Sequence, residues 1–290
     1  MKVLIVGSNG QVGSCLVSQL LGKAHVLAVD RDQLDITDKG AVFHTISQFR
    51  PDYIVNAAAH TAVDKAENEI ELSYAINRDG PAYLAQAASE IDAVFLHIST
   101  DYVFDGESQT EYDESMPTAP HGIYGKSKLA GEHVVADLTE KFIILRTAWV
   151  FGEHGHNFVK TMLRLGATRD ALNIVSDQVG GPTYAGDIAA ALIKIISYIE
   201  NGGKPGWGIY HFSGMPHVSW FDFAAQIFQK AKESNVLVSI PTLLPILTSA
   251  YPTPAKRPSN SRLNCEKIRK QFDIEPSNWQ LALDNIQAYK

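Results

Sequence analysis

Tyr124 and Lys128 are the residues whose types and spacing most directly suggest chemistry. They stand four positions apart, so on a helix they share one face, about one turn from each other. An ammonium beside a phenol favours the phenolate and lowers the pKa of the tyrosine from its usual value of about 10. We therefore expect a phenol that acts as a general acid or base near neutral pH. An ordinary solvated helix face is the alternative, and by itself this spacing more often means that.

Two hydroxyl residues precede this pair at the end of a predicted strand. Residues 95–98 form an apolar run typical of a buried strand, and Ser99 and Thr100 follow it. Ligands of open α/β sheets bind in the crevice outside the carboxyl ends of the strands. A hydroxyl at such an end, with a tyrosine and a lysine on the next helix, indicates an oxidoreductase site.

The elements that must position this site alternate through the first half of the chain. Short apolar runs typical of strands are separated by segments whose apolar residues have helical spacing. The predicted strands cover residues 3–6, 25–29, 53–56, 95–98 and 141–146, and helices are predicted around 12–21, 41–46, 77–89 and 124–128. This alternation is typical of right-handed βαβ units and a parallel sheet. We predict the α/β class, with a Rossmann-type doubly wound parallel sheet in residues 1–150.

A glycine-rich loop, with Gly7, Gly10 and Gly13, follows the first predicted strand. Glycines let a dinucleotide phosphate approach the backbone, and the helix that follows offers free N–H groups and partial positive charge. The spacing differs from G-x-G-x-x-G, and a plain glycine-rich turn is the alternative. Asp30 ends the second strand, where it can bind both adenosine ribose hydroxyls and favours NAD, whereas Arg31 could meet the 2′-phosphate of NADP. The choice of cofactor stays open, and a solvated pair at a strand end is the alternative for these two residues.

The second half of the chain is less regular. Helices are expected at 158–167, 186–198 and 220–232, and short strands at 172–175 and 208–212. Residues 241–258 carry five prolines, too many for a regular element, so we expect a surface loop that helps cover a substrate. We interpret residues 151–290 mainly as a smaller, discontinuous substrate domain, some segments of which return to the first domain.

Composition excludes several classes of protein. The formal net charge of -7 argues against a nucleic-acid surface, because lysine and arginine drive phosphate binding. Cys15 and Cys265 lack the spacing of a disulfide framework or a metal site, which is typical of reduced thiols in a cytoplasmic protein. No apolar run approaches the ~18 residues of a membrane span, and the first residues lack a signal-peptide pattern. We expect a cytoplasmic protein that binds neither nucleic acid nor membrane.

These residues together resemble the extended short-chain dehydrogenase/reductase family, over nearly the whole chain. The early motifs fit any extended member, and they are Gly7-x-x-Gly10-x-x-Gly13 and Asn56-Ala-Ala-Ala-His-Thr-Ala-Val-Asp-Lys65. Other motifs are similar, more narrowly, to reductases of dTDP-bound keto sugars. These are Thr100-Asp-Tyr-Val-Phe-Asp-Gly106, Trp149 within Arg146-Thr-Ala-Trp149, and Arg257-Pro-Ser-Asn-Ser261.

The resemblance implies a cofactor, a substrate and a catalytic set. The cofactor is NADPH or NADH, and the substrate is the C4 ketone of a dTDP-bound 6-deoxy sugar. Tyr124 would protonate the C4 oxygen while hydride reaches C4, and Thr100 would donate to the developing alkoxide. Lys128 would hold the nicotinamide ribose and depress the pKa of the tyrosine. The implied catalytic residues are Thr100, Tyr124 and Lys128.

The resemblance also assigns binding residues. Those for the cofactor are Gly7, Asn9, Gly10, Gln11, Val12, Gly13, Asp30, Arg31, Asn56, Ala57, Ala58, Ala59, Tyr124 and Lys128. Those for the substrate are Val63, Asp64, Thr100, Tyr102, Trp149 and Arg257. A plain core role is the alternative for Trp149. The Arg257 guanidinium could meet the substrate diphosphate bidentately, and its alternative is a surface arginine beside a proline.

One departure from the family concerns a metal. Some reductases of this group are associated with Mg²⁺ and with a dimer through acidic residues, one of them on the first helix. Residues 12–20 contain no carboxylate, and a hard cation needs oxygen ligands. We therefore predict no metal site and no metal-bridged dimer, while a homodimer of another kind stays open.

Two other functions compete with the reductase. A nucleotide-sugar epimerase or 4,6-dehydratase of the same family is the nearer one. In the dehydratase branch a glutamate after the Thr-Asp pair takes the C5 proton, and Tyr102 stands there in this chain. A non-catalytic regulatory subunit with this fold is the other, but the presence of Thr100, Tyr124 and Lys128 favours an enzyme.

Overall fold

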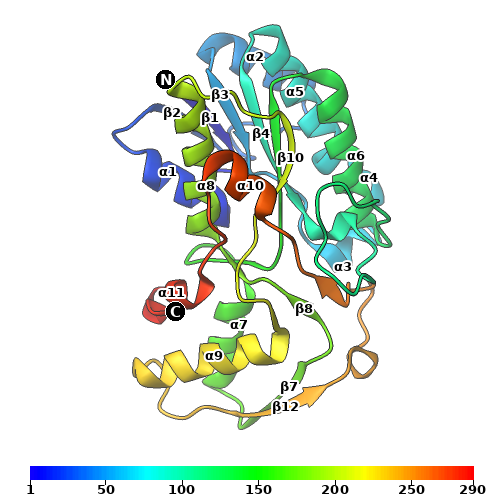
Figure 1. The fold of residues 1–290 in the computed structure, drawn as a ribbon, viewed down its shortest axis with the longest axis vertical. Helices are drawn as coiled ribbons and strands as arrows, with labels where there is room; N and C mark the ends of the chain where they lie inside the picture. Colours follow the sequence, from blue (N-terminus) through cyan, green and yellow to red (C-terminus); the bar gives the residue numbers. More distant parts are fainter.

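A six-stranded parallel sheet organises the structure, a computed structural model that describes residues 1–290 (Figure 1). The strands lie in the order β2-β1-β3-β4-β5-β10, and every neighbouring pair is parallel. Their bounds are β1 Lys2–Val6, β2 His25–Val29, β3 Tyr53–Asn56, β4 Val94–Thr100, β5 Phe142–Thr147 and β10 Gly208–His211. The chain order reverses between β1 and β3, which makes the crevice at their carboxyl ends the expected ligand site. The predicted α/β class and Rossmann-type sheet are confirmed.

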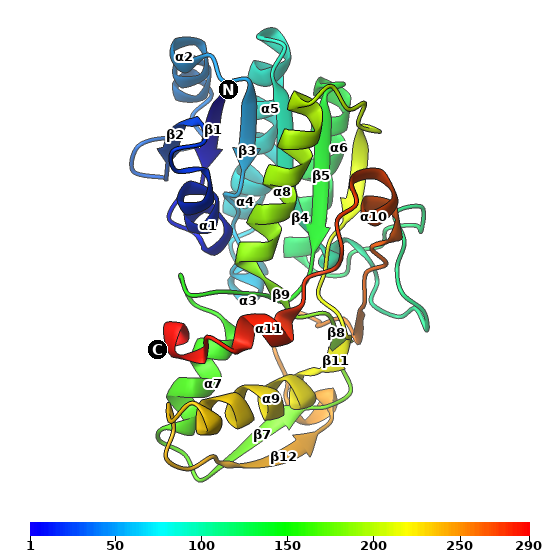
Figure 2. The same cartoon turned by 60° about the vertical axis from the view of Figure 1, so that its left-hand side comes forward.

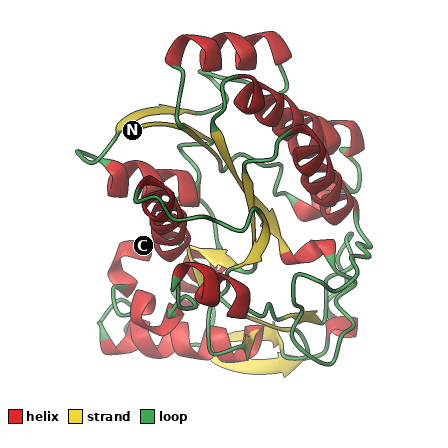
Figure 3. Ribbon diagram, turned by 45° about the horizontal axis from the view of Figure 1, so that its top comes forward, coloured by secondary structure: helices red, strands yellow, loops and turns green.

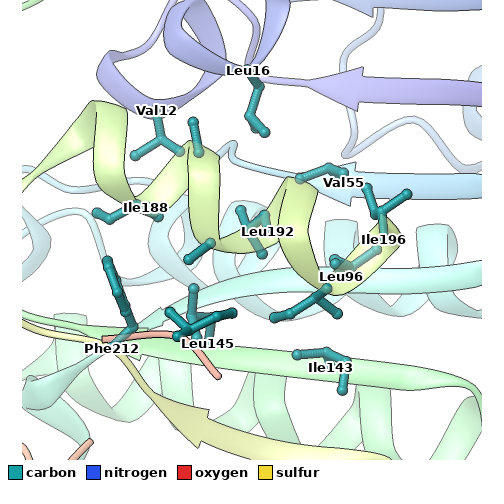
Figure 4. Close-up of a cluster of buried hydrophobic side chains, with 14 of the residues drawn as sticks. Val12, Leu16, Val55, Leu96, Ile143, Leu145, Ile188, Leu192, Ile196 and Phe212 are labelled. Carbon is teal, nitrogen blue, oxygen red and sulfur yellow. The ribbon is translucent and has the colours of Figure 1, made fainter. Parts of the chain in front are cut away.

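Helices cover both faces of this sheet because its strands are apolar on both sides. Val3 and Ile5 contribute to one layer of the core, and Leu4 and Val6 to the other. Figure 4 shows the first layer, where Leu16 and Leu192 meet side chains of the central strands. Figure 2 shows α1 and α8 in front of the sheet, with α5 and α6 behind it. The helices are α1 Gln11–Leu20, α8 Ala185–Glu200 and α10 Glu266–Phe272 on the first face, and α2 Lys39–Phe49, α5 Gly80–Glu90 and α6 Ile123–Leu138 on the second.

A smaller unit, below the sheet in Figures 1 and 3, has its own buried core. Phe151, Phe223, Phe228 and Trp279 are the large side chains of this core. The unit and its connections comprise β6 Val150–Phe151, α7 Phe158–Gly166, β7 Ala171–Val175, β8 Val179–Gly180, β9 Thr183–Tyr184, β11 Val218–Ser219, α9 Trp220–Glu233, β12 Thr242–Ile246, η3 Thr248–Ala250, β13 Asn260–Ser261, α11 Trp279–Leu283 and η4 Ile286–Tyr289. Between the segments of this unit, α8 and β10 belong to the sheet and its helical cover. No helix anywhere in the chain has the length and apolar character needed to cross a membrane.

The expectation that residues 241–258 contain no regular element is wrong in part. Thr242–Ile246 form strand β12, which pairs in parallel with β7 in a two-stranded sheet. A strand with a partner on one side only can accommodate Pro245, since a proline lacks only the N–H that would face the open edge. The rest of the segment is irregular apart from the short turn η3, and β13 begins two residues after the segment ends.

Helix α6, which carries Tyr124 and Lys128, is held against a π-helical turn, η1, at Ala75–Asp79. The sequence predicted one helix from residue 77 to 89, whereas the structure has this turn followed by α5. Asn77 in the turn is fully buried, and its amide donates to Ser127 Oγ of α6 at 3.0 Å and to the carbonyl of His60 at 3.1 Å. Gly131 lets the two backbones approach, because a Cβ there would lie 2.1 Å from the Asn77 carbonyl oxygen. The remaining short helices beside it are α3 Val63–Ala66, α4 Ile70–Tyr74 and η2 Asp101–Val103.

Replacing Gly131 with alanine should test this close contact. Gly131→Ala forces a methyl group into backbone, so it should destabilise the protein by about 1–3 kcal/mol or more. Gly40→Ala is the matched control, because Gly40 also lies in a helix but its added Cβ would come no closer than 3.4 Å to another atom. Helix propensity alone should make the control slightly stabilising. The measurement is the urea midpoint of unfolding, and equal midpoint shifts for the two variants would contradict the contact.

Candidate active site

The glycine loop and the ends of three strands enclose a cavity of about 340 Å³. Gly7 has a φ of +78°, and a Cβ there would lie 2.6 Å from the backbone nitrogen of Ala58. Gly13 is equally constrained, since its Cβ would lie 2.1 Å from the Gly7 carbonyl oxygen. The loop is therefore folded tightly at the N-terminus of α1, whose first N–H groups have no partner within the helix. Of the predicted cofactor residues, those that line the cavity are Gly7, Gly10, Asp30, Arg31, Ala57, Ala58 and Ala59.

Asp30 and Arg31 take different positions at the edge of this cavity. Asp30 is fixed by two backbone donors, the N–H of Asn9 at 2.9 Å and the N–H of Arg31 at 2.6 Å. The Arg31 side chain is 73% exposed, and its guanidinium is 3.9 Å from Asp35. The carboxylate is thus preorganised to accept hydrogen bonds from ribose hydroxyls, whereas the guanidinium is free to meet a phosphate.

The other predicted cofactor residues are not part of the cavity lining. The Val12 side chain is buried in the core layer shown in Figure 4, so only its backbone could face a cofactor. The Gln11 side chain accepts a hydrogen bond from the Asn157 amide at 3.0 Å. Asn56 is fully buried, and its Oδ1 accepts from the N–H of Ala58 at 3.1 Å.

Tyr124 and Lys128 face the end of β4, with Lys128 almost fully buried at 1% exposure. The Lys128 ammonium nitrogen donates to the carbonyl of Ile98 at 2.7 Å and lies 3.3 Å from Nε2 of His97. Tyr124 packs edge-on against Tyr102, with ring centroids 5.4 Å apart. The phenol, the ammonium and the strand end predicted from sequence are therefore brought together.

The predicted lowering of the tyrosine pKa is wrong. Burial of the Tyr124 phenol raises its pKa above the usual value of 10, and Thr100 opposes that shift only in part. Burial also lowers the pKa of Lys128, to about 8, against the opposing effect of Glu132. Desolvation is the largest cause of the shift at both groups, and Lys128 is not among the groups that shift the pKa of Tyr124.

Thr100 is held by two hydrogen bonds at the end of β4. Its hydroxyl donates to Oδ1 of Asp101 at 3.0 Å and accepts from the N–H of Tyr102 at 3.2 Å. Asp101 is buried, which raises the pKa of its carboxyl to about 6. The Thr100 hydroxyl hydrogen is thus directed at the Asp101 carboxylate in this structure.

A second cavity, of about 510 Å³, opens between the sheet and the smaller unit. Its wall includes Asp64, Tyr102, Trp149 and Arg257, four of the six predicted substrate residues. The other two, Val63 and Thr100, are not part of the wall. Much of the remaining lining is apolar and comes from α7, β7 and α9, with Tyr251 and Thr253 from the proline-rich segment.

Arg257 is paired with protein groups in this structure. One guanidinium nitrogen lies 2.6 Å from the Asp64 carboxylate, and another donates to the Tyr102 hydroxyl at 3.3 Å. Asp64 also accepts from the N–H of Ala255 at 3.2 Å, so it anchors the proline-rich segment to α3. The three predicted substrate residues therefore form one hydrogen-bonded group at the cavity wall.

Trp149 is partly exposed in the wall, which argues against the plain core role. It has a φ of +50°, a strained conformation for a residue with a side chain. Its indole stacks on Trp220 with ring centroids 3.5 Å apart, and a Cβ on Gly180 would lie 2.6 Å from the ring. The strain is retained because the neighbouring groups fix the indole in the cavity wall.

Sequence reasoning missed several residues of the site. His97 contacts Lys128. Trp220 stacks on Trp149, and His60 lines the cofactor cavity. A histidine within the apolar strand at residues 95–98 was the available signal for the first, because a buried polar side chain needs hydrogen-bond partners. No local pattern marked Trp220, which is brought to Trp149 from 71 positions away by the fold.

Comparison with known proteins agrees with this geometry. A family model described as the RmlD substrate binding domain matches residues 1–289. A dTDP-4-dehydrorhamnose reductase of Aggregatibacter actinomycetemcomitans is 51% identical over 99% of each chain. A crystal structure of a dTDP-4-dehydrorhamnose reductase from Clostridium acetobutylicum has a TM-score of 0.92 at 40% identity and covers 99% of this chain and 98% of that one. A Bacillus anthracis structure with the same name, in complex with NADP, has a TM-score of 0.91 at 36% identity and covers 100% and 99%.

Burial of Lys128 should be visible in the pH dependence of stability. The pKa of Lys128 is about 8 when folded and about 10.4 in an unfolded chain. Between those values the unfolded state binds a proton that the folded state has lost, so this group makes stability rise with pH. The free energy of unfolding of the wild type should therefore gain on the order of 2 kcal/mol between pH 7 and pH 10 relative to Lys128→Met.

Urea unfolding of both proteins at the two pH values measures this difference, in which the other titrating groups cancel. Lys141→Met is the control, because Lys141 is a surface residue paired with Asp92. That variant should keep the wild-type pH dependence. An identical pH dependence for Lys128→Met and the wild type would show that Lys128 has an ordinary pKa.

Proposed function

The chain belongs to the family of the RmlD substrate binding domain, and on that basis we propose that it is an NAD(P)H-dependent reductase of the extended short-chain dehydrogenase/reductase type. The reaction is reduction of the C4 ketone of dTDP-4-dehydro-6-deoxy-L-mannose to dTDP-L-rhamnose. The names of the relatives, at 51% and 40% identity over nearly the whole chain, support the substrate and the pathway of dTDP-rhamnose biosynthesis.

One observation carries the proposal: two cavities open at neighbouring strand ends, beside the residues that we propose as catalytic. The cofactor cavity is formed at the ends of β1, β2 and β3, and the second cavity at the ends of β4 and β5. Thr100 ends β4, the strand of the second group that adjoins β3 of the first, and Tyr124 and Lys128 face it from α6. We propose that residues 1–150 bind mainly the cofactor and that residues 151–290 supply most of the sugar-nucleotide site.

The chain's own side chains would divide the reduction as follows. When bound, the reduced nicotinamide supplies the hydride for C4. Tyr124 gives its proton to the C4 oxygen, since its raised pKa keeps the phenol protonated at neutral pH. Thr100 would donate its hydroxyl hydrogen to the developing alkoxide, in exchange for its bond to Asp101. Lys128 directs its remaining hydrogen-bonding capacity toward the cofactor ribose, because its other contacts are Ile98 and His97.

The second cavity suits a sugar nucleotide. Arg257 presents a guanidinium that can exchange its bond with Asp64 for a bidentate contact to a diphosphate. Trp149 and Trp220 present stacked indoles whose faces and edges pack well against a sugar or a base. We assign Val63, close to Asp64 at the start of α3, to the edge of the same site.

Partners and location follow from the same chemistry. A net charge of -7 opposes a nucleic-acid surface. Cys15 and Cys265 are both free and buried, which supports a reducing, cytoplasmic setting. We propose a cytoplasmic enzyme whose partners are its cofactor and a dTDP-sugar, with a homodimer as the form left open.

The test of function supplies dTDP-glucose and, separately, the 4-keto-L-sugar nucleotide, and follows nicotinamide absorbance alongside the sugar products. A reductase should oxidise one reduced cofactor per 4-keto sugar and leave dTDP-glucose unchanged. It should also purify largely free of nicotinamide, since its cofactor must leave after each turnover. Conversion of dTDP-glucose to a 4-keto-6-deoxy product without added cofactor would instead assign the chain to the dehydratase branch.

Tyr124→Phe should separate chemistry from binding in the same assay. The ring remains but the proton donor is lost, so kcat should fall by ~10²–10⁴ while cofactor binding survives. Tyr102→Phe is the matched control, because Tyr102 packs against Tyr124 and its hydroxyl contacts Arg257. The control should affect mainly the KM for the sugar nucleotide. A near-normal kcat in Tyr124→Phe would remove the phenol from the mechanism.

Cofactor preference should depend on the charge at the cavity edge. Arg31→Ala should raise the KM for NADPH and leave that for NADH nearly unchanged, because only NADPH carries the 2′-phosphate. Asp35→Asn is the opposing variant, since it removes the carboxylate beside Arg31 while keeping the oxygen that binds Thr37. It should lower the KM for NADPH. Equal changes for both cofactors in Arg31→Ala would show that Arg31 does not contact the phosphate.

A further inference from the structure

His97 is a buried histidine whose two ring nitrogens are both engaged. It lies on β4 with 0% exposure, two residues before Ser99. Its Nδ1 is 3.1 Å from Nδ2 of Asn56, and its Nε2 is 3.3 Å from the Lys128 amine nitrogen. Asn56 and Lys128 are also buried, at 0% and 1% exposure. Phe95 and Ile98 of the same strand are apolar, so packing alone does not account for an imidazole here. Its two hydrogen bonds therefore indicate a chemical role.

The direction of these hydrogen bonds can be worked out from one backbone group. The N–H of Ala58 can only donate, and it donates to Oδ1 of Asn56 at 3.1 Å. The Asn56 amide nitrogen therefore faces His97, where it donates to Nδ1. A neutral imidazole that accepts at Nδ1 carries its hydrogen on Nε2. That N–H points at Lys128.

An N–H directed at Lys128 discriminates between the two forms of the lysine. An ammonium has three donors and no acceptor, so it is opposed by the imidazole N–H, whereas a neutral amine has a lone pair that accepts it. The bond from Lys128 to the carbonyl of Ile98 can form in either state. The ring itself is kept neutral, because burial and then the charge of Lys128 lower the pKa of His97.

The charged groups around this pair are few. On α6, Glu132 lies one turn beyond Lys128 and favours its ammonium form, but Glu132 is already bonded to Arg146 of β5. At the end of β4, Asp101 is buried and bonded to Thr100. None of these groups lies between His97 and Lys128, so the imidazole is the immediate neighbour of the amine.

We propose that His97 is a positioning residue whose hydrogen, placed by Asn56, disfavours the ammonium form of Lys128 in the free enzyme. The chain of contacts begins at Ala58, which lines the cofactor cavity. The wall of that cavity thus fixes the imidazole, and the imidazole fixes the lysine. This inference rests on the proposed role of Lys128 in binding the cofactor.

The test measures the Kd for NADPH by fluorescence between pH 6 and pH 10, together with the Tm of each protein. An ammonium binds ribose oxygens better than an amine does, so the Kd of the wild type should rise as Lys128 loses its proton. His97→Gln can turn its carbonyl oxygen toward Lys128, which favours the ammonium. The pH at which the Kd rises should then increase by about one unit, a shift of the size that one such polar contact produces.

Asn56→Asp provides an independent variant, because a carboxylate accepts from Nδ1–H and leaves Nε2 free to accept from Lys128. This variant should also raise the pH at which the Kd increases. His211→Gln is the control, since His211 is equally buried but contacts Arg146 and the carbonyl of Tyr112. The control should lower the Tm and leave the pH at which the Kd rises unchanged.

Two failures can be told apart by Lys128→Met. If the Kd of that variant still rises with pH, the transition belongs to another group, and the proposed role of Lys128 in cofactor binding is wrong. If the rise is lost in Lys128→Met but stays at the wild-type pH in both His97→Gln and Asn56→Asp, only the inference about His97 is overturned. A wild-type Kd that is constant from pH 7 to pH 9 overturns it as well.

Discussion

A buried ion pair between α6 and β5 fixes the geometry on which the site depends. Arg146 Nη2 lies 2.6 Å from Glu132, and both side chains are at most 3% exposed. Ser99 of β4 donates to the same carboxylate at 2.5 Å, so one acidic group joins a helix to two strands. Replacement of such pairs by apolar residues is often neutral or stabilising, so we infer that this pair specifies one arrangement of α6 more than it adds stability. Here the pair specifies where α6 lies relative to the ends of β4 and β5.

The position of α6 determines where the side chains of Tyr124 and Lys128 lie. Lys128 and Tyr124 precede Glu132 by four and eight residues, so all three share one face of α6. Glycines at 125 and 131 let this face approach its neighbours, with added Cβ atoms 2.2 Å from the Tyr102 carbonyl and 2.1 Å from that of Asn77. The helix therefore cannot rotate or slide without breaking the ion pair or its close backbone contacts. The phenol and the amine are positioned by groups that have no direct part in the reaction.

The sequence predicted the parts of this arrangement that depend on local pattern. Apolar runs and helical spacing were sufficient for the parallel sheet, for the glycine loop at the end of β1, and for the pairing of Tyr124 with Lys128 near Thr100. It could not predict contacts between distant segments, such as Trp149 on Trp220 or Arg257 with Asp64, because these depend on the packing of the smaller unit. Strand β12 was missed because proline was counted against any regular element, although a strand with an open edge tolerates it.

The sign of the tyrosine pKa shift was the error with the most consequence for chemistry. Spacing alone indicated a cation that would make the phenol easier to ionise. In the structure the amine is held by Ile98 and His97, and desolvation is the largest cause of the raised pKa of the phenol. A base that starts an oxidation must be ionised, but the donor in a reduction must carry its proton before hydride arrives. A phenol with a raised pKa meets that requirement throughout the neutral range. It can still transfer the proton, because an alkoxide is a much stronger base than a phenolate, so desolvation at Tyr124 keeps the phenol in the protonated form from which a reduction starts.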